Sequence, residues 1–221
     1  MNNSNFDLLK DALGHMPLVA ILRGIQPNEI EGIGRVLIDE GFRFIEVPLN
    51  SPDAWESIRR LKAMVPENVL IGAGTVIDGR ASAELAELGA VLQITPNTDV
   101  DVIQAGKVAG LATFTGFMTP SEAFSAIKAG TTALKLFPAQ RLGCDYFKDI
   151  KAVLPKGIPV FAVGGVNASN MDEWFDAGIS GFGFGSNLYK PGRTPEEVRI
   201  LAAELVQVWT KLANTKNEKT Y

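Results

Sequence analysis

A repeated unit runs through this sequence, in which an amphipathic segment ends in a glycine and a short apolar run follows. Five such junctions occur, at Gly41, Gly89, Gly110, Gly130 and Gly178. A glycine at this place suits a helix end in the left-handed conformation, from which the chain can turn directly into a strand. The pattern therefore predicts helices that alternate with strands of a parallel sheet.

The five runs after these glycines and three further apolar runs are strand candidates. They cover residues 18–24, 42–49, 69–76, 90–97, 111–118, 131–139, 158–165 and 179–186. Eight strands alternating with helices favour a single (β/α)8 barrel, the α/β fold known as the TIM barrel, over residues 1–221. Residues 4–14 are expected to form an extra helix across its bottom. A doubly wound open sheet is the alternative.

Three helix starts carry a proline at the first helical position, after Ser51, Thr119 and Thr194. The last two also have a glutamate three residues after the threonine, which predicts capping boxes. At the other end of the chain, residues 214–221 are polar and are expected to form a disordered tail.

Charge and residue counts exclude several functions. The 21 basic and 25 acidic residues give a net charge of −4, so no overall positive field attracts nucleic acid or a membrane surface. Cys144 and His15 are each the only residue of their type, which excludes an internal disulfide and a His/Cys metal cluster. Neither a secretory signal nor a membrane span is evident, so we expect a cytoplasmic protein.

Among the polar residues of the predicted strands, Arg23, Glu46, Thr75 and Lys135 are the candidates for chemistry. Barrel strands are mostly apolar, and functional side chains project from their C-terminal ends. If Leu134 and its alternate neighbours pack on the helices, side-chain alternation turns Lys135 into the barrel. The same parity turns Glu46 inward and puts Arg23 on the inner face of strand 18–24.

An inward lysine beside an acid suits covalent catalysis. Burial and a neighbouring cation lower the pKa of a lysine from about 10.4, and the neutral amine attacks ketones. Lys135 is therefore predicted to form a Schiff base, with Glu46 moving protons, through water, as a general acid/base. The alternative is a structural ion pair of Glu46 and Lys135, which seldom stabilises a barrel interior.

Glycines also gather at the ends of the last two strands, as Gly164-Gly165 and Gly185-Ser186. Loops in these two units of a barrel commonly bind phosphate through backbone N–H groups. Plain turn glycines would explain either segment alone, but both together favour a phosphate site. Neither segment has the helix and later acidic residue of a dinucleotide fingerprint, so no NAD site is expected.

Several of these segments together resemble a known family. They are AILRGI (20–25), EVPLNSP (46–52), IGAGTV (71–76), ITPN (94–97), ALKLFPA (133–139), FAVGGV (161–166) and GFGSNLY (183–189). Across residues 17–190 the chain resembles the class I pyruvate aldolases of the KDPG/KDPGal family, and its galactonate-type members most. The resemblance implies reversible cleavage of 2-dehydro-3-deoxy-6-phosphogalactonate to pyruvate and D-glyceraldehyde 3-phosphate, a homotrimer, and no cofactor or metal.

Site roles follow from the same resemblance, residue by residue. It implies that Lys135 is the Schiff-base lysine and Glu46 the general acid/base. The implied substrate contacts are Arg23 and Thr75 for the carboxylate, Pro96 and Phe137 as walls of the imine, Val163 beside them, and Gly164, Gly165, Gly185 and Ser186 for the phosphate. Residues 113–119 match the family more loosely.

Two positions separate the subfamilies. Gluconate-type relatives carry an arginine where this chain has Asn50 and a threonine where it has Val163. Both positions argue against a gluconate-type or 4-hydroxy-2-oxoglutarate aldolase, which is the alternative enzyme. Arg23 is available to replace the missing guanidinium. A non-catalytic phosphosugar-binding barrel, or an isomerase that uses Glu46 without an imine, is the alternative of a different class.

Overall fold

The computed structural model describes residues 3–218 and contains a closed barrel of eight parallel strands. The strands are β1 (Leu18–Ile21), β2 (Phe44–Pro48), β3 (Leu70–Gly74), β4 (Leu92–Ile94), β5 (Ala112–Phe117), β6 (Ala133–Leu136), β7 (Val160–Val163) and β8 (Gly181–Phe184). All eight predicted strands are confirmed. The barrel closes where Val19 of β1 pairs with Gly183 of β8, which rules out the open sheet.

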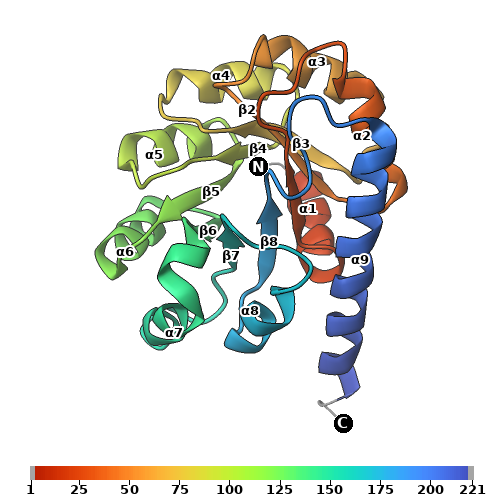
Figure 1. The fold of residues 1–221 in the computed structure, drawn as a ribbon. Helices are drawn as coiled ribbons and strands as arrows, with labels where there is room; N and C mark the ends of the chain where they lie inside the picture. Colours follow the sequence, from red (N-terminus) through yellow and green to blue (C-terminus); the bar gives the residue numbers. More distant parts are fainter. Residues whose placement is uncertain (1–2, 219–221) are drawn as a thin grey trace.

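Helices surround the strands (Figure 1). They are α1 (Asn3–His15), α2 (Ile30–Asp39), α3 (Ala54–Met64), α4 (Arg80–Glu87), α5 (Val100–Val108), α6 (Pro120–Ala129), α7 (Ala139–Lys151), α8 (Met171–Ala177) and α9 (Pro195–Glu218). As predicted, α1 precedes the first strand, and its Leu9 and Ala12 pack with the residues inside the barrel. Between Asn3 and Glu218, no helix has the length and apolar character needed to cross a membrane.

Side-chain alternation along the strands separates two apolar cores. Outward residues such as Ile45 and Leu134 pack with the helices. Inward residues such as Phe44 and Ala133 fill the barrel. The predicted parity of β2 and β6 is therefore correct, because successive residues of a strand point to opposite faces.

The predicted junction glycines and capping boxes are confirmed. All five junction glycines have a positive φ, between 72° and 98°. Thr119 forms the predicted capping box with Glu122, and Thr194 makes the equivalent hydrogen bonds with Glu197.

Two sequence predictions about helix ends are wrong. Helix α3 begins at Ala54, after Asp53, and not after Ser51. The Ser51 hydroxyl instead accepts a hydrogen bond of 2.9 Å from the Gly24 backbone N–H, which joins two loops at the top of the barrel. In addition, α9 continues through Glu218, so residues 214–218 are helical where disorder was expected. Residues 219–221 of that expected tail lie outside the described residues.

Candidate active site

A cavity of about 260 Å³ lies at the C-terminal end of the barrel strands. Its lining comes from β1, β2, β6, β7 and β8 and the loops that follow them. The lining residues are Ile21, Arg23, Glu46, Lys135, Phe137, Val163, Gly164, Gly165, Val166, Gly183, Gly185, Ser186 and Asn187. This is the end of the fold at which barrel enzymes carry their active sites.

Glu46 and Lys135 both point into this cavity, and both are almost completely buried. Their exposed fractions are 1% and 6%. Glycine at position 74 makes room for the acid, because a Cβ atom there would lie 1.9 Å from Oε2 of Glu46. The sequence thus leaves a gap in β3 that the carboxyl group of β2 occupies.

Burial shifts the pKa values of the two groups in opposite directions. It raises the pKa of the Glu46 carboxyl from 4.5 to about 7, although the charges of Lys135 and Arg23 and a backbone hydrogen bond from Gly74 act against this. Burial lowers the pKa of the Lys135 ammonium below 10.5; the Glu46 charge opposes this, and the Arg23 charge adds to it. The pair is thereby suited to proton transfer near neutral pH.

The surroundings of the pair are apolar. Under it lie Phe44, Phe114 and Phe161, with ring centroids 4.9 to 6.4 Å apart. The Nζ atom of Lys135 lies 5.0 Å from the centroid of the Phe137 ring. Such walls exclude water and favour the uncharged form of each group.

The pair does not have the geometry of a structural ion pair. Among the ion pairs within 4.0 Å in residues 3–218, none joins Glu46 to Lys135. Within the same residues, Oε2 of Glu46 accepts no hydrogen bond. This oxygen is therefore available to exchange a proton with a bound molecule.

Arg23 lies two residues past the end of β1, in a turn, and not on the strand as the alternation suggested. Its guanidinium donates to Oδ1 of Asn50 at 2.6 Å and to Oγ1 of Thr75 at 3.2 Å. Thr75 has a left-handed backbone, with φ of 54°. A side chain is strained in this conformation, and such strain is concentrated at functional sites. The three residues join the loops after β1, β2 and β3.

Consecutive glycines shape another part of the cavity lining. Gly164 and Gly165 have φ values of 97° and 83°. A Cβ atom on Gly165 would also lie 2.0 Å from Oε1 of Gln140. The backbone after β7 can follow this path only with glycine, and it lines the same cavity as Gly185 and Ser186 of the neighbouring β8 unit. The arrangement can present backbone N–H groups to an anion.

Two predicted site residues do not line the cavity. Thr75 is connected to it through Arg23. Pro96 lies against Gly116, since a Cβ atom on Gly116 would lie 2.3 Å from the Pro96 backbone. Gly116 of β5 is in turn the strand partner of Lys135 in β6. Conversely, Asn187 lines the cavity but was not predicted. It follows Ser186 in the GFGSNLY segment, which could have pointed to it.

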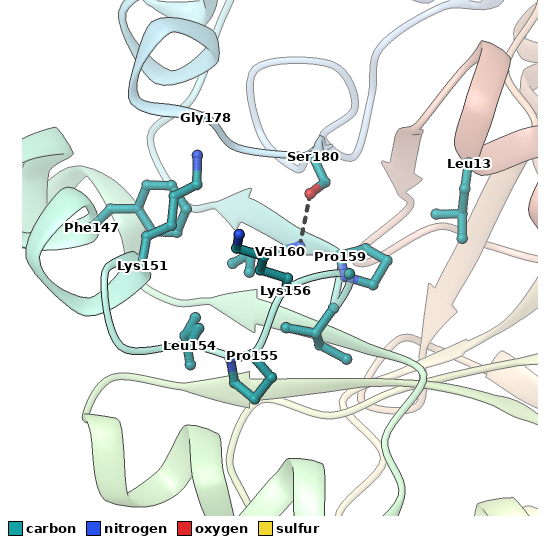
Figure 2. Close-up of a pocket in the computed structure, with 12 residues that line it drawn as sticks. Leu13, Phe147, Lys151, Leu154, Pro155, Lys156, Pro159, Val160, Gly178 and Ser180 are labelled. Carbon is teal, nitrogen blue, oxygen red and sulfur yellow. Dashed lines mark hydrogen bonds between the residues drawn. The ribbon is translucent and has the colours of Figure 1, made fainter.

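A larger cavity, of about 400 Å³, lies at the opposite end of the barrel (Figure 2). Lys151 and Lys156 border it. Two of its polar side chains already make hydrogen bonds within the fold: Nζ of Lys151 donates to the Ala177 carbonyl at 3.4 Å, and the Ser180 hydroxyl accepts from the Val160 N–H at 3.1 Å. The smaller cavity, where the buried acid and amine converge, is therefore the candidate active site.

The raised pKa of Glu46 has a consequence for stability. A folded-state pKa of about 7 against 4.5 unfolded means that ionisation destabilises the native state as pH rises from 4.5 through 7. Relative to Glu46→Gln, the wild-type free energy of unfolding should fall by about 3 kcal/mol across this window. Urea unfolding at pH 5 and pH 8 measures the difference. A difference independent of pH would contradict a buried, ionising Glu46.

The fold and the cavity define the class: a (β/α)8-barrel enzyme with a buried amine and carboxyl at the C-terminal ends of its strands. Residues 9–199 match the family model described as "Aldolase: KDPG and KHG aldolase". The chain belongs to the KDPG and KHG aldolase family, whose members are carbon–carbon lyases. Within residues 3–218, no three His, Cys, Asp or Glu side chains are grouped as metal ligands.

Two relatives and one solved structure support this assignment. The "Probable 2-dehydro-3-deoxy-6-phosphogalactonate aldolase" of Rhizobium meliloti (strain 1021) is 45% identical over 83% of this chain and 86% of its own. The 2-dehydro-3-deoxy-6-phosphogalactonate aldolase of Escherichia coli (strain K12) is 43% identical over 88% and 95%. A structure described as "Native KDPGal structure" superposes with a TM-score of 0.88, at 42% identity over 90% of this chain and 97% of that one.

Proposed function

We propose that this chain cleaves 2-dehydro-3-deoxy-6-phosphogalactonate reversibly to pyruvate and D-glyceraldehyde 3-phosphate, through a Schiff base on Lys135. The observation that carries the proposal is the buried amine of Lys135 with a lowered pKa, beside the buried Glu46 carboxyl with a pKa of about 7. The names of the two relatives, both phosphogalactonate aldolases, support the substrate.

The proposed reaction begins with attack of the neutral Lys135 amine on the C2 ketone. Loss of water gives a protonated imine, and the electrons of the C3–C4 bond move towards it as that bond breaks. Glu46 takes the C4 hydroxyl proton, directly or through water, so that the aldehyde leaves. The remaining enamine takes a proton at C3, and hydrolysis of the imine releases pyruvate and the free lysine.

The substrate contacts are proposed on the same basis. Arg23, held by Thr75, would bind the carboxylate. Phe137 and Val163 border the reacting carbons. Pro96 lies against Gly116 of β5, the strand next to the one that carries the lysine. The proposed phosphate contacts are the groups of the two glycine segments, at Gly164, Gly165, Gly185 and Ser186.

Borohydride reduction in the presence of pyruvate tests the central step. A Schiff base is reduced to a permanent adduct, and we expect it on Lys135 alone, because this lysine is inward, buried and within the electrostatic influence of Glu46. Peptide mass mapping locates the adduct. An adduct on Lys62, Lys107 or Lys128 would refute the assignment. No adduct at all would favour an isomerase or a non-catalytic binding barrel.

A gluconate-type or 4-hydroxy-2-oxoglutarate aldolase is the second candidate. It shares the lysine chemistry but differs in the substrate, and Asn50 and Val163 argue against it. Val163 lines the cavity beside Gly164 and has no hydroxyl to offer a substrate. Comparison of kcat/KM on the galactonate and gluconate epimers decides between the two.

Replacement of Arg23 by lysine should weaken pyruvate binding. A guanidinium can make two parallel hydrogen bonds to a carboxylate, whereas an ammonium group acts as a point charge. The loss should be roughly 1.5–3 kcal/mol, the size of a charge-assisted contact. The measurement is the pyruvate concentration for half-maximal inactivation by borohydride. An unchanged value would move Arg23 from the carboxylate to the phosphate, which pyruvate lacks.

We also propose a homotrimer, as the resemblance implies, with a cytoplasmic location. Large apolar side chains at Ile77, Val100, Met118 and Phe124 are 41% to 66% exposed on successive β–α units. Exposed apolar residues that gather on one side are typical of subunit contacts. Sedimentation equilibrium tests the trimer.

A further inference from the structure

The guanidinium of Arg23 is fixed by neutral groups. Both of its hydrogen-bond acceptors, the Asn50 amide and the Thr75 hydroxyl, are uncharged, and they lie 27 and 52 residues away along the chain. The bond to Asn50 is the shorter, at 2.6 Å against 3.2 Å. Because a guanidinium only donates, the amide must present its oxygen to it. The orientation of Asn50 is therefore determined by this contact.

A neutral partner has a different effect from an acidic one. A carboxylate at this place would form a strong ion pair with the guanidinium and compete with an anionic substrate for it. An amide limits the motion of the side chain and leaves its positive charge uncompensated. Arg23 is otherwise exposed, and a free arginine side chain loses rotational freedom when it binds a ligand. A guanidinium already held in place loses less.

We infer that Asn50 is a positioning residue, which holds Arg23 at the mouth of the cavity while leaving its charge free for the carboxylate of a 2-keto acid. This inference rests on the proposed function. Asn50 does not itself line the cavity, so it acts through Arg23. The loop after β2 also contacts the loop that carries Arg23 at a second point, because the Ser51 hydroxyl accepts a hydrogen bond from the Gly24 N–H.

Two variants with side chains of nearly the same shape as asparagine test the two parts of this inference. One tests the contact that orients Arg23, and the other tests the absence of a negative charge beside it. Asn50→Leu removes the acceptor, and Asn50→Asp keeps an acceptor but adds a negative charge. Each should raise the pyruvate concentration for half-maximal borohydride inactivation by about tenfold. This corresponds to the lower end of the range of contributions known for hydrogen bonds to charged groups. In Asn50→Leu, kcat for cleavage should stay within about twofold, because only binding common to ground and transition states is lost.

The control is Asn28→Leu, the same change at an exposed asparagine of the loop after β1. None of the side-chain hydrogen bonds in the described residues involves Asn28. A second control repeats Asn50→Leu in an Arg23→Met background. If Asn50 acts through Arg23, Asn50→Leu should cause no further rise in the half-saturating pyruvate concentration in this background, as expected for two coupled residues.

The outcomes separate this inference from the proposed function. An unchanged half-saturating concentration in either Asn50 variant, or a full effect of Asn50→Leu in the Arg23→Met background, would overturn the positioning role. A fall in kcat of Asn50→Leu without a change in pyruvate binding would also overturn it. Failure of the wild-type protein to form any pyruvate adduct would contradict the proposed function itself.

Discussion

Lys135→Ala should lower kcat for aldol cleavage by about 10⁴-fold or more, the scale seen when a residue of a covalent catalytic unit is removed. The remaining groups can still bind substrate but cannot form an imine. Burial of a lysine costs stability, so its loss should leave the fold intact or more stable. Single-turnover kinetics and far-UV circular dichroism measure the two effects.

Two further variants control for this result. Lys128→Ala makes the same change at an exposed lysine in the last turn of α6 and should have wild-type kinetics. Lys135→Met keeps most of the side-chain volume, so it remains informative if the alanine variant leaves a cavity and unfolds. A folded Lys135→Met protein with near wild-type cleavage would exclude the Schiff-base mechanism.

Glu46→Gln should lower kcat by about 10²-fold or more, the usual contribution of a general acid/base. The amide keeps the shape of the side chain but cannot take up a proton. Trapping of the imine by borohydride should continue, although more slowly, because Lys135 is still present. Steady-state cleavage rates from pH 5 to pH 9 measure the effect.

The pH dependence provides a second readout for Glu46. Its pKa of about 7 should give the wild-type rate profile an inflection near neutral pH, which Glu46→Gln should lack. Glu84→Gln, at an exposed position of α4, is the matched control and should keep the wild-type profile. A near wild-type kcat in Glu46→Gln would remove this residue from the mechanism.

The architecture and the inward positions of Glu46 and Lys135 could be predicted from the sequence alone. Strands alternate with period 2, and a glycine in the left-handed conformation ends a helix within a few residues; both properties depend on local backbone geometry. Local geometry was therefore enough to predict eight strands, the five glycine junctions and the inward direction of Glu46 and Lys135. The inferred chemistry of these two residues remains a prediction.

The contacts between the loops at the C-terminal end of the barrel could not be predicted from the sequence. Ser51 looked like a helix cap but accepts a hydrogen bond from Gly24, and Arg23 looked like a strand residue but lies in a turn held by Asn50. The cavity lining includes Asn187 but not Pro96. Loops have no period, and their partners lie tens of residues away. Closure of the barrel brings these partners together, and no local pattern records which of them will meet.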